Sequence, residues 1–106
     1  MPELKVYGHS DDLIELEGIT GADEFSKPSG AWVGVIEAPN GDTALLYVDY
    51  RQNGCWTASL GIYEEGYKLP EWPVTVGTDA AYANQYSTVT TLTVPEGTTV
   101  REYTDE

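Results

Sequence analysis

The chain has little cysteine and few basic residues, and each shortage excludes a class of protein. Among its 106 residues there is one cysteine, and five Lys and Arg stand against 18 Asp and Glu, for a net charge of −13. Because Cys55 is alone, a small fold held together by internal disulfides is excluded. The surplus of carboxylates repels nucleic acid and anionic membranes, so we expect no direct binding to either.

Long hydrophobic runs are missing as well. No stretch approaches the roughly 20 apolar residues that a membrane span needs, and residues 1–5 lack the basic start and apolar run of a signal peptide. The apolar fraction of 41%, with eight Tyr and three Trp, is enough to fill a core. We therefore expect a single acidic, β-rich domain over residues 1–106, located in the reducing cytoplasm.

What the sequence does have is a series of short β-prone runs separated by turn residues. Residues 13–17 alternate apolar and acidic side chains, which is the period of a half-buried strand, and we expect them to form a hairpin with residues 4–8. The firmest prediction is an antiparallel meander, because Asn40-Gly41 and Asn53-Gly54 favour hairpin turns. The three runs that these turns join are residues 31–38, 43–51 and 55–63.

The second half of the chain contains a break and two further strands. Pro70 and Pro73 exclude residues 64–73 from a central strand, and residues 74–76 are a candidate edge strand. Residues 86–94 are rich in β-branched side chains and are predicted to be a strand. The turn at residues 95–97 predicts that residues 98–103 pair back onto that strand.

The predicted fold class is all-β. About eight short strands, with no amphipathic helix, favour an antiparallel meander closed into a small sandwich or barrel. Residues 20–30 are expected to form a loop with one helical turn at residues 22–25, and the class becomes α+β if that turn is counted.

The acidic residues near the first turn have the types of a metal site but not its spacing. Carboxylates suit Ca²⁺ or Mg²⁺ and histidine suits transition metals, yet the calcium-loop pattern is absent. Successive outward side chains on one strand, such as Glu15 and Glu17, lie about 7 Å apart. The alternative is a turn stabilised by its own side chains, so we expect no metal and no cofactor. The residues concerned are His9, Asp11, Asp12, Glu15 and Glu17.

Nothing in the chain indicates an enzyme. Nucleophilic catalysis needs a nucleophile beside a base, and the only His and Cys are His9 and Cys55, which no local motif connects. A lone Cys is more often a small core residue. A glycine-rich phosphate loop is also absent.

Residues 72–94 stand out because Asp79 is their only charged residue. Uncharged, aromatic, hydrogen-bonding surface is typical of recognition patches, which makes Trp72, Tyr82 and Tyr86 candidate ligand-binding residues. The alternative is that Trp72 simply packs. We expect the strand tyrosines, such as Tyr47, to lie in the core or in cross-strand pairs.

The segment from Val6 to Gly18, VYGHSDDLIELEG, resembles a family of small proteins encoded by phages and prophages. Members of that family begin with a Y-G-H-S-D-D-x-I-E-x-E-G type motif, and they often end with a Tyr-Ser run, here Tyr86-Ser87, and a final strand. The resemblance carries no activity. It implies a phage accessory gene acting in the host cytoplasm, with interference in host defence as one role.

Charge and resemblance together predict a stoichiometric inhibitor. A compact acidic protein can occupy the basic nucleic-acid channel of a host nuclease or CRISPR effector, with carboxylates standing in for phosphates. The alternative is that the charge serves only solubility or a salt-rich habitat. The candidate partner-binding residues are Asp11, Asp12, Glu15, Glu17, Glu64, Glu65 and Glu71.

The sequence leaves three other functions open. A sponge for a signalling nucleotide would stack a base on Trp72, Tyr82 and Tyr86 and meet phosphate with Arg51 or Arg101. A virion or assembly protein needs no site at all. An enzyme would have only His9, Asp11 and Asp12 to use.

Overall fold

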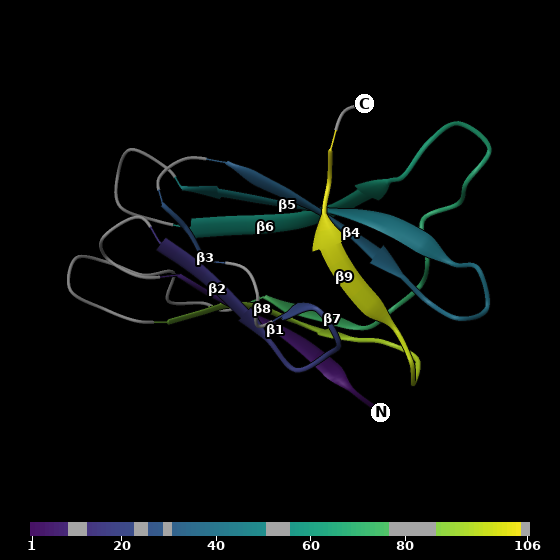
Figure 1. Cartoon of the computed structure of the whole chain (residues 1–106), viewed down its shortest axis with the longest axis horizontal. Helices are drawn as coiled ribbons and strands as arrows, with labels where there is room; N and C mark the ends of the chain where they lie inside the picture. The colour runs from purple at the N-terminus through teal and green to yellow at the C-terminus, as the bar shows by residue number, and fades with distance from the viewer. Residues whose placement is uncertain (9–12, 23–25, 29–30, 51–55, 77–86, 105–106) are drawn as a thin grey trace.

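The protein is a two-layer β-sandwich (Figure 1). The computed structural model describes residues 1–8, 13–22, 26–28, 31–50, 56–76 and 87–104, and every structural statement below concerns these residues. They contain nine strands and no α-helix. The strands are β1 (Glu3–Gly8), β2 (Leu13–Glu17), β3 (Ser26–Pro28), β4 (Trp32–Glu37), β5 (Thr43–Tyr50), β6 (Trp56–Ile62), β7 (Val74–Val76), β8 (Ser87–Thr93) and β9 (Thr99–Glu102).

The strands divide into a five-stranded sheet, in the order β3-β2-β1-β8-β7, and a four-stranded sheet, in the order β6-β5-β4-β9. Every pairing between strands is antiparallel. The predicted all-β sandwich is thus confirmed. The additional strand is β3, which pairs with β2 inside the segment predicted to be a loop. Its last residue is Pro28, and an edge strand is where a sheet tolerates proline. Of the helical turn expected at residues 22–25, only Ala22 is described, in a 3₁₀ conformation.

The predicted meander forms the four-stranded sheet through β4, β5 and β6. At the first turn Gly41 has a φ of 98°, which favours glycine, and the Asn40 side chain accepts a 3.0 Å hydrogen bond from the Asp42 amide. The second predicted turn, residues 53–54, lies outside the described residues. The register of β5 with β6 nevertheless runs without interruption from Ala44↔Ile62 to Tyr50↔Trp56.

The prediction that residues 98–103 pair back onto residues 86–94 is wrong. β8 already has β1 on one side and β7 on the other, so it has no free edge. The chain instead crosses between the sheets, and β9 pairs with β4 from Glu37↔Thr99 to Gly34↔Glu102. The crossing turn is held by Thr98, whose amide and hydroxyl both donate to the Pro95 carbonyl, at 3.2 Å and 2.6 Å.

The core lies between the inner faces of the two sheets, and alternation along each strand supplies it. In β1 and β2 every second side chain is buried, as in Leu4, Val6, Ile14 and Leu16. Burying each such side chain contributes about 1.5–3 kcal/mol. From the other sheet the core receives Trp32, Ile36, Leu46, Val48 and Val100.

The two long sides of the sandwich are closed in different ways. On one side β9 is tied to the segment after β2 by the Thr20↔Thr99 bridge, with the Val100 amide donating to the Thr20 carbonyl at 3.1 Å. On the other side the edge strands β6 and β7 are connected by residues 63–73, which we call the strap. The strap carries Leu69, Pro70 and Trp72 against that side.

Candidate functional site

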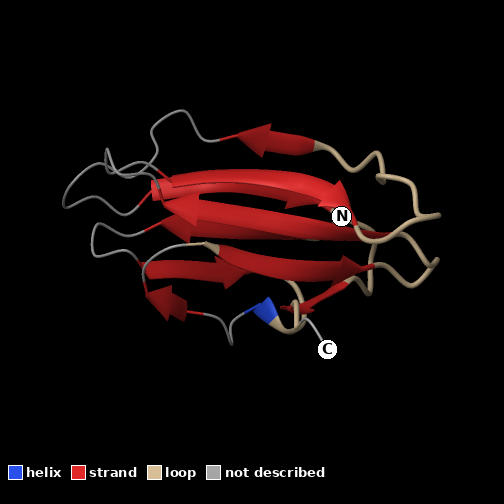
Figure 2. Cartoon of the chain, turned by 90° about the horizontal axis from the view of Figure 1, so that it is seen from above, coloured by secondary structure: helices blue, strands red, loops and turns tan. Residues whose placement is uncertain are grey.

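One end of the sandwich gathers the described turns (Figures 1 and 2). β1 begins at Glu3, β2 ends at Glu17 and β4 ends at Glu37, all at this end. The strap leaves β6 here, because Ile62 lies opposite Ala44 at the start of β5. The turn at 95–98 also lies here, since a Cβ on Gly97 would come within 2.9 Å of the Pro39 ring.

This end also holds most of the described negative charge. The structure describes eleven acidic residues, and eight of them, all exposed, lie at this end. We call these eight the acidic end: Glu3, Glu17, Glu37, Asp42, Glu64, Glu65, Glu71 and Glu96. The other three, Glu15, Asp49 and Glu102, lie within strands. Lys5 and Lys68 lie in the same region as the acidic end and neutralise part of its charge.

The seven predicted partner-binding carboxylates are partly brought together. Glu17 ends β2, and Glu64, Glu65 and Glu71 lie on the strap, so all four belong to the acidic end. Glu15 lies one pleat further along β2, exposed on the outer face of the five-stranded sheet. Asp11 and Asp12 lie outside the described residues, as do His9, Arg51, Cys55, Tyr82 and Tyr86.

Three carboxylates of the acidic end accept hydrogen bonds within the protein, and the simplest case is Asp42 Oδ2, which accepts one from Asn40 Nδ2 at 3.3 Å. Glu37 Oε1 accepts a hydrogen bond from Arg101 Nε at 3.1 Å, and both side chains are about half exposed, so the pair contributes at most about 1 kcal/mol. Glu17 accepts a 3.4 Å hydrogen bond from the Tyr7 hydroxyl. By contrast, Glu64, Glu65 and Glu71 have no ion-pair partner within the described part of the chain.

These contacts shift two pKa values. The pKa of Tyr7 is raised, first by burial and then by the Glu17 carboxylate, since both disfavour the phenolate. The pKa of Arg101 is also raised, mainly by its hydrogen bond to Glu37 and then by one to Tyr63. Arg101 is therefore a fixed positive charge already committed to its neighbours.

The outer face of the four-stranded sheet carries tyrosines that the sequence analysis did not single out as a surface. Tyr47 is 42% exposed and therefore not a core residue, although its ring makes a cross-strand contact over Gly61. Tyr63 and Tyr67 meet edge to face, with ring centres 5.1 Å apart. We call Tyr47, Tyr63, Tyr67 and Tyr103 the tyrosine face.

Beneath the tyrosine face, Val35 and Leu45 are buried although they lie on the outer side of the sheet. Tyr63, just after β6, hydrogen-bonds Arg101 on β9, so the two side chains meet over the strands between them. The alternation of side chains along β5 could have predicted that this surface is exposed. Tyr47 shares its face with the charged Asp49, which indicates solvent on that side.

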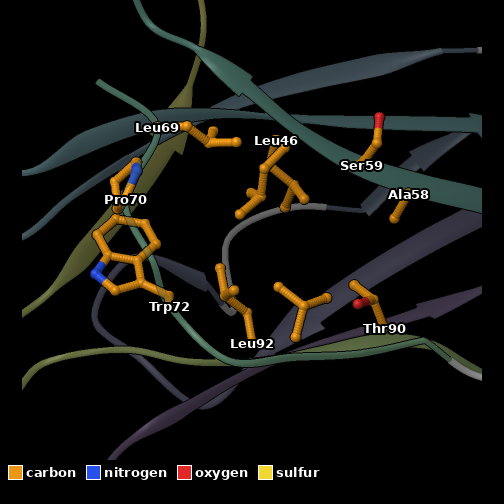
Figure 3. A pocket seen from close by; sticks show the side chains of 10 residues that line it. Leu46, Ala58, Ser59, Leu69, Pro70, Trp72, Thr90 and Leu92 are labelled. Atoms are coloured by element: carbon orange, nitrogen blue, oxygen red, sulfur yellow. The ribbon is translucent and has the colours of Figure 1, made fainter. Parts of the chain in front are cut away.

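A cavity of about 290 Å³ lies between the two sheets on the side that the strap crosses (Figure 3). Its walls are apolar, and Trp72 presents ring carbons to it while the indole nitrogen lies on the far side of the ring. Thr90 is one of two polar residues at the cavity, and its hydroxyl donates to the Thr75 carbonyl at 3.1 Å. The residues that line the cavity are Leu46, Ala58, Ser59, Leu60, Leu69, Pro70, Trp72, Val74, Thr90 and Leu92.

The proposed nucleotide site is not assembled from the described residues that were assigned to it. Trp72 is partly buried and packs against the core on the β6–β7 side of the sandwich. Arg101 lies on β9, at the opposite edge of the four-stranded sheet, and bonds Glu37 on the outer face. Trp72 therefore packs against the core and also lines the cavity, and its role in binding stays a prediction.

Two further kinds of feature are absent from the described residues. No group of three or more His, Cys, Asp or Glu among them could hold a metal ion. None of them forms a helix long and apolar enough to cross a membrane.

Comparisons with known protein families, with curated proteins and with solved structures found no match to this chain. The resemblance of residues 6–18 to phage proteins therefore stays a prediction. The described features that bear on function are the acidic end, the tyrosine face and the cavity.

Proposed function

We propose that this chain is a binding protein whose acidic end occupies a basic, nucleic-acid-binding surface of a partner protein. The observation that carries the proposal is that eight of the eleven described carboxylates, all exposed, lie at one end of the sandwich. Exposed carboxylates gathered on neighbouring turns produce a local negative field, which steers a basic partner and raises its rate of association.

The fold suits this role because the carboxylates are borne on strand ends and on turns anchored to both sheets. A rigid display lowers the entropy that is lost on binding. Tyr63 and Tyr67 flank Glu64 and Glu65 on the same strap. Tyrosine is enriched at protein interfaces, where it also contacts Lys and Arg through its ring. Carboxylates beside aromatic rings match a surface that normally binds phosphates and bases.

We further propose, on the resemblance of residues 6–18, that the partner belongs to host defence against phages, such as a CRISPR effector or another nuclease. In that role the protein inhibits by occupying the nucleic-acid channel and performs no catalysis.

The test is inhibition of DNA cleavage by a purified CRISPR effector and by a panel of basic nucleases. The triple variant Glu64→Gln/Glu65→Gln/Glu71→Gln removes three charges from the acidic end. The matched control Glu15→Gln/Asp49→Asn/Glu102→Gln removes three charges elsewhere. We expect the first variant to need at least about tenfold more protein for half inhibition and the control to resemble the wild type.

Inhibition should also weaken steeply between about 50 mM and 500 mM NaCl, because salt screens the attraction. The proposal is overturned if no member of the panel is inhibited, or if both triple variants lose inhibition equally.

A further inference from the structure

The cavity between the sheets has a use that the acidic end does not explain. Protein interiors rarely contain voids much larger than one water molecule, which occupies about 30 Å³ in the liquid. The cavity measures about 290 Å³, and hydrocarbon from both sheets and from the strap forms most of its wall. Water inside the cavity would find few hydrogen-bond partners, because most of the wall is hydrocarbon.

The cavity is also accessible from solvent. Leu69 and Val74 both line it, yet each is 47% exposed, so it opens beside these two side chains. In the chain, Leu69 comes directly before Pro70, and Val74 begins β7 two residues after Trp72. On the opposite long side of the sandwich, the Thr20↔Thr99 bridge ties β9 to the segment after β2.

The negative charge of the strap restricts which ligands can enter the cavity. Glu71 is exposed and lies in the chain between Pro70 and Trp72, two lining residues. Glu64 and Glu65 lie at the start of the same strap, where Lys68 is the one base, and the whole chain carries −13. A carboxylate or phosphate head group at this opening meets repulsion, whereas an ammonium group is attracted.

We propose that the cavity is a binding site for a small amphiphile with an unbranched apolar tail of about eight carbons and a positively charged amine head group. The tail fills the space between Leu46, Leu92 and Trp72, and the amine lies at the opening beside the acidic strap. The tail length follows from the volume, since 290 Å³ holds on the order of ten non-hydrogen groups of about 30 Å³ each. This site is independent of the proposed binding of a basic partner.

The experiment compares three probes of the same tail length: octylamine, octanol and octanoate. Binding is followed by thermal unfolding, and ¹⁵N chemical shifts of the purified protein locate the site. We expect octylamine to raise the melting temperature and to shift the amides of Ala58, Leu69, Trp72 and Leu92. Octanol should bind more weakly, and octanoate at least about tenfold more weakly than octylamine.

Two variants separate the cavity from general adsorption of an amine to an acidic protein. Ala58→Leu places a larger side chain in the cavity and should weaken octylamine binding at least about tenfold while the variant still unfolds cooperatively. Thr57→Leu adds the same side chain to the same strand on its exposed face, away from the cavity, and should leave binding unchanged.

A site that takes octanoate as tightly as octylamine overturns the proposed head group. Absence of any melting shift with all three probes, or unaltered octylamine binding in Ala58→Leu, overturns the site. Because none of these measurements involves a partner protein, their failure is distinct from failure of the proposed inhibition.

Discussion

Two glycines of the four-stranded sheet lie beside aromatic rings that differ in their freedom to move. A Cβ at Gly34 would overlap the ring of Trp32, which is 2% exposed and enclosed by the core. A Cβ at Gly61 would overlap the ring of Tyr47, which is 42% exposed on the outer face. The overlap is similar, but only the tyrosine can move into solvent. The cost of the same substitution should therefore differ.

We expect Gly34→Ala to lower the free energy of unfolding by about 1–3 kcal/mol, because the buried indole has to shift. Gly61→Ala should change it by less than about 0.5 kcal/mol, since the Tyr47 ring rotates away and the alanine lowers the entropy of the unfolded chain. Urea unfolding followed by circular dichroism measures both. Equal losses in the two variants would contradict the assignment of inner and outer faces.

Tyr7 offers a second measurement at the scale of a residue. Its folded pKa is raised above the unfolded value of 10.0. The neutral phenol therefore contributes stability that is present below pH 10 and lost as the pH rises through the folded pKa. Glu17→Gln removes the carboxylate and should lower the pKa of Tyr7, though not fully to 10.0, because burial remains the larger cause.

The ¹³C shift of Tyr7 Cζ against pH reports this pKa directly. Glu96→Gln is the control. Glu96 lies on the turn after β8 and is not one of the groups that raise the pKa of Tyr7. An unchanged Tyr7 pKa in Glu17→Gln would mean that the 3.4 Å contact is absent in solution.

At the scale of the elements, the crossing from β8 to β9 decides the architecture. Local pattern correctly predicted both strands and the turn between them, yet it placed them side by side. Strand pairing depends on which edges are free, and β8 is occupied on both sides by strands that are distant in the chain. β9 consequently completes the other sheet and closes one long side of the sandwich.

The turn that makes this crossing can be weakened selectively. Thr98 is buried and its hydroxyl donates to the Pro95 carbonyl at 2.6 Å. Thr98→Val keeps the shape but removes that hydrogen bond, so we expect a loss of about 1 kcal/mol in unfolding free energy. Thr99→Val, one residue along at the start of β9, should change stability by less than about 0.5 kcal/mol. Chemical denaturation distinguishes the two, and equal effects would show that the Thr98 hydroxyl does not hold the turn.

For the whole molecule, the charge of −13 acts on stability as well as on recognition. Eight carboxylates at one end repel one another in the folded protein more than in the extended chain, where they are further apart. Salt screens this repulsion over a distance of about 10 Å at 0.1 M. The folded state should therefore gain from added salt.

We expect the melting temperature at pH 7 to rise by several degrees between about 10 mM and 500 mM NaCl, where 1 kcal/mol corresponds to about 4–8 °C in a domain of this size. At a pH near the isoelectric point of about 4.1, the same salt should have little effect, because the net charge is then close to zero. Differential scanning calorimetry at the two pH values tests this. A salt response of equal size at both would point to a cause other than repulsion.

Local sequence pattern was sufficient for the strands and the hairpins of this protein. Alternation with a period of two is visible in neighbouring residues, and the Asn40-Gly41 turn needs nothing beyond its own backbone. β3 was not predicted, because it has only three residues and ends in proline. The acidic residues themselves, including Glu64, Glu65 and Glu71, were also evident from composition.

The gathering of the described acidic residues at one end of the sandwich was not evident from the sequence. It results from the order of strands in two sheets and from the turns that tie those sheets together. The tyrosine face and the cavity were also not evident from the sequence. Each consists of residues from strands far apart in the chain, brought together only when the strands compete for edges and the two layers pack. Chemistry that depends on such neighbours is decided by the tertiary structure.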